Sequence, residues 1–255
     1  MRASIPLAAL ALALAPLTAP ADEATTWNLS SLYSYSALSD DRGDWNEGEI
    51  ELLGRATPDL TLGAHVDIRD RSHGTDELYG VLASYRLTHR LEAHANARWS
   101  PSPHFSARQT YGGGVEWRMI DPLSATLDYD WMDFPAGRLH QVKPALTWWF
   151  DERTFLTARY TYGRAYSDTA FTAYLVRLTA GLPRDAALTL VWAHGIDPEK
   201  DPGIPGVLLT MANNYAAAVR LPVSNRLDLI LGGEYEDRHR LYTRRTATAG
   251  LSVKF

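Results

Sequence analysis

Cysteine is absent from the 255 residues, which excludes disulfides, thiolate metal sites, a cysteine nucleophile and a lipid-modified amino-terminal cysteine. Positive charge is also scarce, with 25 Lys and Arg against 30 Asp and Glu. The resulting net charge of -5 opposes a nucleic-acid partner, which requires a surplus of basic residues. After residue 21, no apolar run approaches the roughly 18 residues that a membrane-spanning helix needs.

The amino terminus has the features of a secretory signal peptide. Arg2 supplies a positive charge, residues 5–17 form an Ala/Leu-rich run, and Ala19 and Ala21 place small residues before a cleavage site. We therefore expect residues 1–21 to be removed during export and residues 22–255 to form one domain. Tyr and Trp, 13 and 8 in number, outnumber the 6 Phe, and such amphipathic aromatic residues concentrate at bilayer boundaries.

The rest of the chain alternates between apolar and polar residues with the two-residue period of β-strands. In residues 60–69, one face is wholly apolar and the other is polar or small. The same pattern recurs in residues 91–100, 123–132 and 227–236. Fourteen strand-like segments can be distinguished, beginning near residues 26, 45, 60, 76, 90, 105, 123, 138, 154, 170, 186, 208, 226 and 242.

Two classes of fold contain such strands: a soluble sandwich that buries the apolar face, and a transmembrane barrel that turns it toward lipid. The connections favour the barrel, because tight turns such as residues 57–59 alternate with longer polar loops, the longest being residues 195–206. The sequence therefore predicts an all-β fold, a single transmembrane antiparallel β-barrel with about 14 strands, short periplasmic turns and longer extracellular loops. Twelve strands are the alternative if the region around Pro144 or the loop before Leu208 is misassigned. Because a closed barrel has no edge strand, Pro144 predicts a bulge or a broken pairing.

Tryptophan placement and the carboxyl terminus agree with a barrel in the outer membrane. The last strand ends on Gly250, Val253 and Phe255, in a pattern that resembles the signal read by the barrel-assembly machinery, apart from the aliphatic Val253. All eight Trp fall near predicted strand ends, where they would form aromatic girdles at the headgroups of outer-membrane lipid and lipopolysaccharide. These girdle residues are Trp27, Trp45, Trp99, Trp117, Trp131, Trp148, Trp149 and Trp192.

The order of several motifs resembles the YaiO-type outer-membrane β-barrel family. The matching segments are residues 34–36, 97–105, 113–116, 129–134 and 159–162. The resemblance as a whole covers nearly all of the predicted mature chain. The resemblance implies export to the outer membrane of a Gram-negative cell and a single barrel. It supplies no catalytic residues. Related barrels stand beside glycosyltransferase modules, which makes a surface polysaccharide a candidate solute.

With the apolar face toward lipid, charged residues of both signs line the predicted lumen. One interpretation is a cross-strand lattice of salt bridges that fills the interior, and the other is a polar path for a solute. Lys143, Arg220, Asp228, Glu236, Arg244 and Lys254 also face inward in this prediction. The main predicted lattice comprises Glu47, Glu49, Glu51, Asp67, Arg69, Arg86, Glu92, Arg98, Arg108, Glu116, Arg118, Asp128, Asp130, Arg159, Arg177 and Glu234.

Catalysis and metal binding have little support in the sequence. His104 and Ser106 resemble the His-x-Ser pairing of a lipid A deacylase, but Glu116, the next acid downstream, is predicted to lie near the opposite rim. Asp128 and Asp130 could correspond to the acid pair of an outer-membrane protease, but they fall in the middle of a predicted strand and not at the rim. We therefore expect no catalytic residues, no cofactor and no metal ligands, and we interpret His65 and His94 as partners in lumen hydrogen bonds.

The sequence thus favours a non-enzymatic outer-membrane barrel that acts as a narrow passive or export channel. The alternatives are a plugged structural or interaction barrel and, third, a lipid-modifying enzyme. Residues 197–206, with three prolines and two glycines, are expected to be stiff. They could fold over the barrel mouth, or remain as a solvated loop.

Overall fold

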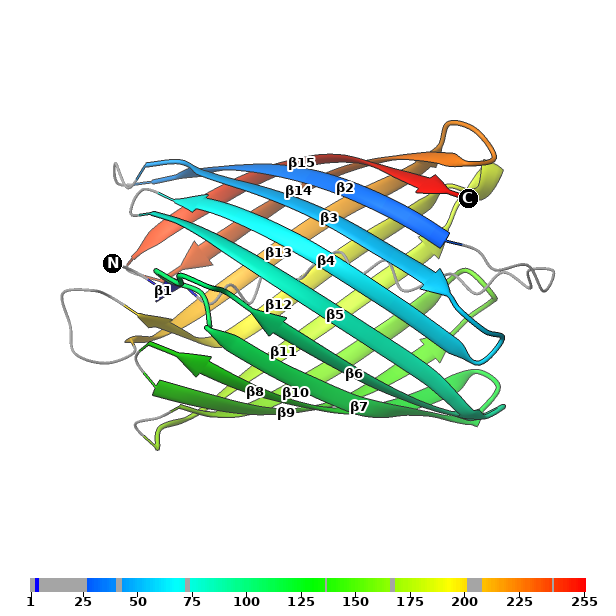
Figure 1. Ribbon diagram of the computed structural model, residues 1–255, viewed down its shortest axis with the longest axis horizontal. Helices are drawn as coiled ribbons and strands as arrows, with labels where there is room; N and C mark the ends of the chain where they lie inside the picture. The colour runs from blue at the N-terminus through cyan, green and yellow to red at the C-terminus, as the bar shows by residue number, and fades with distance from the viewer. Residues whose placement is uncertain are drawn as a thin grey trace.

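The computed structural model describes residues 3–4, 27–39, 43–71, 74–135, 137–165, 168–200, 208–239 and 241–255. Figure 1 shows a barrel of tilted strands. A short β1 (Ala3–Ser4) pairs with β12 at Glu199 and Lys200, and it is the only described part of the predicted signal peptide. The barrel strands are β2 (Trp27–Leu38), β3 (Trp45–Arg55), β4 (Leu60–Arg71), β5 (Gly74–Thr88), β6 (Leu91–Trp99), β7 (Gln109–Ile120), β8 (Leu123–Phe134), β9 (Gly137–Trp149), β10 (Phe155–Ala165), β11 (Ala170–Gly181), β12 (Ala187–Lys200), β13 (Leu208–Pro222), β14 (Leu227–Arg238) and β15 (Tyr242–Lys254).

The fourteen strands β2 to β15 form a closed antiparallel ring. Each strand pairs with its neighbours in sequence, and β15 pairs with β2 to close the barrel. This confirms the predicted all-β barrel and its strand number. Within the described residues the only helical element is a 3-10 turn, η1 (Pro183–Asp185), and none is a long apolar helix able to cross a membrane.

The connections lie at two ends of the barrel. One end, which we call the terminal end because β2 begins and the chain finishes there, carries Trp27, Phe255 and the turns after β3, β5, β7, β9, β11 and β13. The opposite end, which we call the loop end, carries the other connections. The longest is the β6–β7 segment, residues 100–108. The expectation for residues 195–206 is wrong in its extent, because β12 continues to Lys200 and Pro198 pairs with Leu209. Residues 201–207 lie outside the described residues.

Pro144 interrupts one ladder without adding a residue. It pairs with Leu127 of β8, but the pairs between β9 and β10 lapse from Arg159–Ala145 to Tyr162–Val142 while the register is unchanged. The missing N–H of proline accounts for a broken pairing of this kind. Register shifts occur instead at the terminal end, between Arg86 and Thr88 and between Arg118 and Ile120.

Alternation separates an outer face from a lumen face on every strand. Exposed apolar side chains such as Leu62, Val66 and Ile68 follow the outer face of β4, as expected for a surface that meets lipid. Trp99 stacks on Tyr79 and Trp131 on Tyr111, with ring centroids 5.6 Å apart in both pairs. By register, the outward-facing Trp are Trp27, Trp99, Trp117, Trp131, Trp148 and Trp192.

Trp45 and Trp149 are not girdle residues, so their sequence assignment was wrong. Trp45 is only 7% exposed and lies on the lumen face of β3, the same face as Glu47 and Glu49. Trp149 also faces inward and packs on Phe155 at 4.5 Å between ring centroids. Strand alternation determines the face of each residue, and it places these two indoles on the opposite face from Trp148.

Candidate functional site

The lumen wall carries nearly all of the charged residues expected there. Register places Glu47, Glu49 and Glu51 on one face of β3, beside Asp67 and Arg69 of β4. Arg108 is the exception, because it lies in the β6–β7 segment with an exposed side chain. Fifteen of the lattice residues therefore remain on the wall: Glu47, Glu49, Glu51, Asp67, Arg69, Arg86, Glu92, Arg98, Glu116, Arg118, Asp128, Asp130, Arg159, Arg177 and Glu234.

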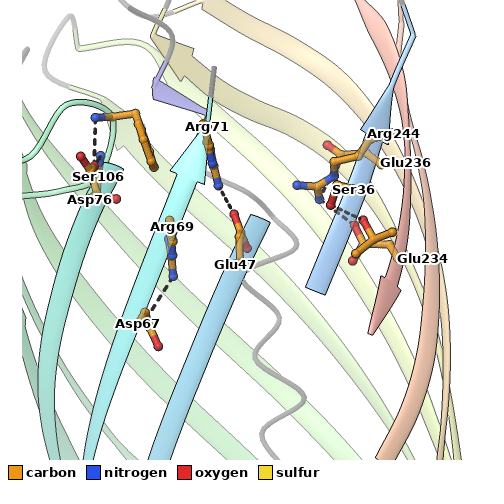
Figure 2. A network of polar contacts seen from close by, with 12 residues as sticks. Ser36, Glu47, Asp67, Arg69, Arg71, Asp76, Ser106, Glu234, Glu236 and Arg244 are labelled. Carbon is orange, nitrogen blue, oxygen red and sulfur yellow. Dashed lines mark hydrogen bonds and ion pairs between the residues drawn. The ribbon is translucent and has the colours of Figure 1, made fainter. Parts of the chain in front are cut away.

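A dense ion-pair cluster occupies the loop end of the lumen (Figure 2). Arg244 of β15 lies 2.7 Å from Glu234 and 2.6 Å from Glu236 of β14. Arg71 of β4 lies 2.7 Å from Glu47 of β3. We call this cluster the mouth network: Glu47, Arg71, Glu234, Glu236, Arg238 and Arg244.

Two aromatic rings hold the guanidinium of Arg71 in place. Its central carbon is 4.1 Å from the ring centroid of Trp45 and 4.4 Å from that of Phe105. Cation–π contacts of this length are favourable when the cation is shielded from water, and Arg71 is only 6% exposed. The inward position of Trp45 therefore serves the mouth network.

The β6–β7 segment folds inward at this end and is anchored by Asp76 of β5. Asp76 Oδ1 accepts hydrogen bonds from the backbone N–H of His104 at 2.7 Å, and Oδ2 accepts from those of Phe105 at 3.1 Å and Ser106 at 2.7 Å. Nδ1 of His104 lies 2.9 Å from Oδ1. Asp76 is fully buried and Phe105 is 2% exposed. One carboxylate thus fixes the part of the segment that carries Phe105 to the lumen wall.

Charges near mid-strand form few ion pairs. Asp130 pairs closely with Lys143, Asp67 lies 3.3 Å from Arg69, and His94 Nε2 is 2.9 Å from Asp128. By contrast, eight of the fifteen wall residues make no ion pair with any other residue in the described ranges. Five of them lie near mid-strand, Glu49, Glu51, Arg98, Arg159 and Arg177, and three lie toward the terminal end, Glu92, Glu116 and Arg118. The predicted lattice is therefore present at the loop end and incomplete in the middle.

The unpaired charges lie on different parts of the wall. Glu49 and Glu51 belong to β3, whereas Arg159 belongs to β10. These two strands are seven apart in a ring of fourteen, so they face each other across the lumen. Arg177 joins Arg159 from β11. The middle of the lumen thus has Glu49 and Glu51 facing Arg159 and Arg177, with Arg98 of β6 on the same side as the two glutamates.

Apolar residues dominate the neighbouring sector of the wall. On β11, β12 and β13, the lumen-facing Leu175, Val191, Ala193 and Ala216 pack into one cluster. Phe155 and Phe171 add aromatic rings to the same sector. The lumen wall is therefore chemically uneven. Apolar surface lies on β10 to β13 around Arg159 and Arg177, and most other charges lie on β3 to β8 and on β14 and β15.

The structure alters the interpretation of His104 and Ser106. The carboxylate beside His104 is Asp76, upstream in the sequence, and not Glu116. Ser106 nevertheless bonds to Asp76 through its backbone N–H, and its buried Oγ has no hydrogen-bond partner. An imidazole activates a serine only by accepting its proton, and no such bond joins these two side chains. Asp76 and His104 act as an anchor in this geometry.

His65 and His94 both face the lumen as expected. The described ranges contain no group of three or more His, Asp or Glu residues placed to hold a metal ion. His94 bonds to Asp128, whereas Nε2 of His65 is buried without a hydrogen-bond partner.

Sequence reasoning missed Arg71, Asp76 and Arg238, which build the mouth. Each of these residues follows the alternation of its own strand. Arg71, for example, stands two residues after Arg69 and four after Asp67, so all three side chains face the lumen. The prediction ended β4 at residue 69 and began the next strand at residue 76, whereas the strands run to Arg71 and from Gly74. Continuing the alternation beyond the length of a membrane span would have found Arg71 and Arg238, whereas Asp76 already stood at the start of a predicted strand and was given no role.

No family model and no curated protein matches the chain, so the YaiO-type resemblance stays a prediction. Solved structures do resemble it. The CymD monoaromatic hydrocarbon channel aligns with a TM-score of 0.61 at 10% identity, covering 99% of this chain and 94% of that chain. A TodX monoaromatic hydrocarbon channel mutant gives 0.54 at 11% identity, with 92% and 90% covered. A bacterial polysaccharide outer membrane secretin gives 0.52 at 9% identity, with 92% and 99% covered. At these identities the likeness establishes the fold alone, which is that of outer-membrane β-barrel proteins.

Proposed function

We propose that the protein is a passive outer-membrane channel with a hydrated lumen that is narrowed at its outer mouth. The observation that carries the proposal is the set of unpaired charges in the middle of the wall: Glu49, Glu51, Arg98, Arg159 and Arg177. These side chains are only half-buried, and a charge that lacks an ion-pair partner is stable on the lumen wall only where water can solvate it. A filled lattice would have paired them. We expect water around these residues, and with it a continuous polar path through the lumen.

The β6–β7 segment supplies the narrowing. The tight turns of outer-membrane barrels face the periplasm, which puts the loop end, with the mouth network and Phe105, on the outside. Asp76 fixes this segment inward with four hydrogen bonds. Charge-assisted hydrogen bonds contribute about 1.5–3 kcal/mol each, so the segment is held as a fixed constriction. The channel should pass small solutes and exclude large ones.

Current through planar bilayers tests the proposal. The refolded barrel should give discrete conductance steps in KCl, and a polyethylene glycol small enough to enter the lumen should reduce the step size. A large polyethylene glycol, which cannot enter, serves as the control. A correctly folded, inserted barrel that carries no current would overturn the proposal and favour a plugged structural barrel.

A further inference from the structure

Two arginines of the lumen wall lie side by side, and neither forms an ion pair in the described part of the chain. Arg159 of β10 pairs with Leu175 of β11, and Arg177 pairs with Thr157, so the two guanidinium groups are diagonal neighbours on one face of the sheet. Diagonal positions are within reach of each other for long side chains, and like charges there are destabilising. Neither arginine forms an ion pair within the described part of the chain, and the Nε of each is buried without a hydrogen-bond partner.

The carboxylates on the same side of the barrel are already engaged. Asp130 of β8 bonds to Lys143, and Asp128 bonds to His94. Both are two strands away from β10. They moderate the positive potential at Arg159. The guanidinium N–H donors of Arg159 and Arg177 nevertheless stay available to an anion. Two adjacent guanidinium forks match the geometry of a carboxylate, which each can bind through paired N–H donors.

The surface next to this arginine pair is apolar. The guanidinium carbon of Arg177 lies 5.9 Å from the ring centroid of Phe155. Leu175, which pairs with Arg159, belongs to the cluster with Val191 and Ala193. An anion held by the two arginines would therefore have an apolar wall beside it, on which a hydrocarbon body can be buried at about 25 cal/mol per Å² of apolar surface.

We infer that Arg159 and Arg177 form a lumen binding site for carboxylates with an apolar body, such as aromatic or short fatty acids. The inference rests on the proposed function, because the site lies on the same passage, and it names the solute class. The charged forks fix the carboxylate, and Phe155, Leu175 and Val191 receive the apolar part. Inorganic anions and acetate lack that part and should bind more weakly.

Binding is measured apart from conductance, by equilibrium dialysis of radiolabelled benzoate against the mature barrel in detergent micelles. Saturable binding of benzoate is expected, with acetate and benzyl alcohol as poor competitors because each lacks half of the recognised structure. The double variant R159Q/R177Q should bind benzoate at least tenfold more weakly. R118Q, which removes a lumen arginine near the terminal end, is the matched control and should bind like the parent.

A second variant separates the apolar contact from the charge. L175S should narrow the difference between benzoate and acetate while it leaves the weak acetate binding unchanged. Equal benzoate binding by the parent and by R159Q/R177Q, both folded, would overturn the inference. Intact binding in a barrel that carries no current would overturn the channel and leave the carboxylate site standing.

Discussion

The main chains of Trp27 and Phe255 exchange two hydrogen bonds of 2.9 Å each, so the first and last residues of the barrel are paired at the terminal end. Phe255 itself lies just outside β15, with an exposed ring. Its backbone thus continues the β15–β2 ladder that closes the barrel, while its side chain stays exposed.

Deletion of Phe255 should therefore reduce assembly more than stability. The variant loses two hydrogen bonds of the closing ladder, worth about 0.5–1.5 kcal/mol each, and the exposed ring that the barrel-assembly machinery is predicted to recognise. We expect much less barrel in the outer membrane of cells but near-normal refolding from urea into detergent. The variant F255Y, which keeps an aromatic ring, is the control. Normal membrane levels of the deletion would show that the terminal ring has no part in assembly.

Trp45 on β3 faces the lumen and Trp99 on β6 faces outward, so we predict different environments for their indole rings. Trp45 lies in the lumen against Arg71, whereas Trp99 is 47% exposed on the outer face. In bilayers of lipids with brominated chains, which quench nearby Trp fluorescence, W99F should lose quenched emission and W45F should lose unquenched emission. Quenching of Trp45 by the brominated chains would place it in the girdle and contradict its position here.

Asp76 predicts a variant with a wider mouth. In D76N the amide has one acceptor oxygen in place of two, and the negative charge that strengthens four hydrogen bonds is lost. The β6–β7 segment should detach from the wall, and single-channel conductance should rise while the barrel stays folded. The matched control is D70N, on the outer side of β4, where Asp70 accepts a hydrogen bond from Thr75. Equal conductance of D76N and the parent would exclude this segment as the constriction.

Pro144 predicts a substitution that costs no stability. The ladder between β9 and β10 already lapses at this position, so P144A removes no pairing and supplies an N–H that can complete one. A completed hydrogen bond contributes about 0.5–1.5 kcal/mol, and we expect the urea midpoint of unfolding to be equal or higher. V142P, a change at the neighbouring outward position where pairing resumes, should lower the midpoint. A lower midpoint for P144A would show that the proline relieves strain elsewhere in β9.

The alternation of apolar and polar residues is the sequence feature that predicts most of the fold. Twelve of the fourteen predicted strand starts lie within one residue of the structure, because a two-residue period on a barrel fixes both face and phase. The largest error concerns β7, which begins at Gln109 and not near residue 105. Phe105 was read as a strand residue, but it is apolar because it packs into the mouth, a tertiary contact that local periodicity does not encode.

The candidate site was predicted only in part for a related reason. The two-residue alternation puts Glu49, Glu51, Arg159 and Arg177 on the lumen face, where the strand register also places them. It does not say which of these charges form ion pairs. Pairing depends on strand neighbours and on the stagger between strands, as when the imidazole of His65 occupies the space over Gly80, on the strand between His65 and Arg98. Two arginines of the mouth network, Arg71 and Arg238, were missed because they lie on strand extensions that no membrane-length criterion includes.

Ion selectivity of the mid-lumen charges is the most direct test of a hydrated channel. Under a KCl gradient across a planar bilayer, E49Q/E51Q should shift the reversal potential toward anion preference, and R159Q/R177Q should shift it toward cation preference, relative to the parent. Opposite shifts of this kind require that permeating ions pass both the patch on β3 and the patch on β10 and β11. Identical reversal potentials in the parent and both double variants, or the absence of any current, would contradict the account.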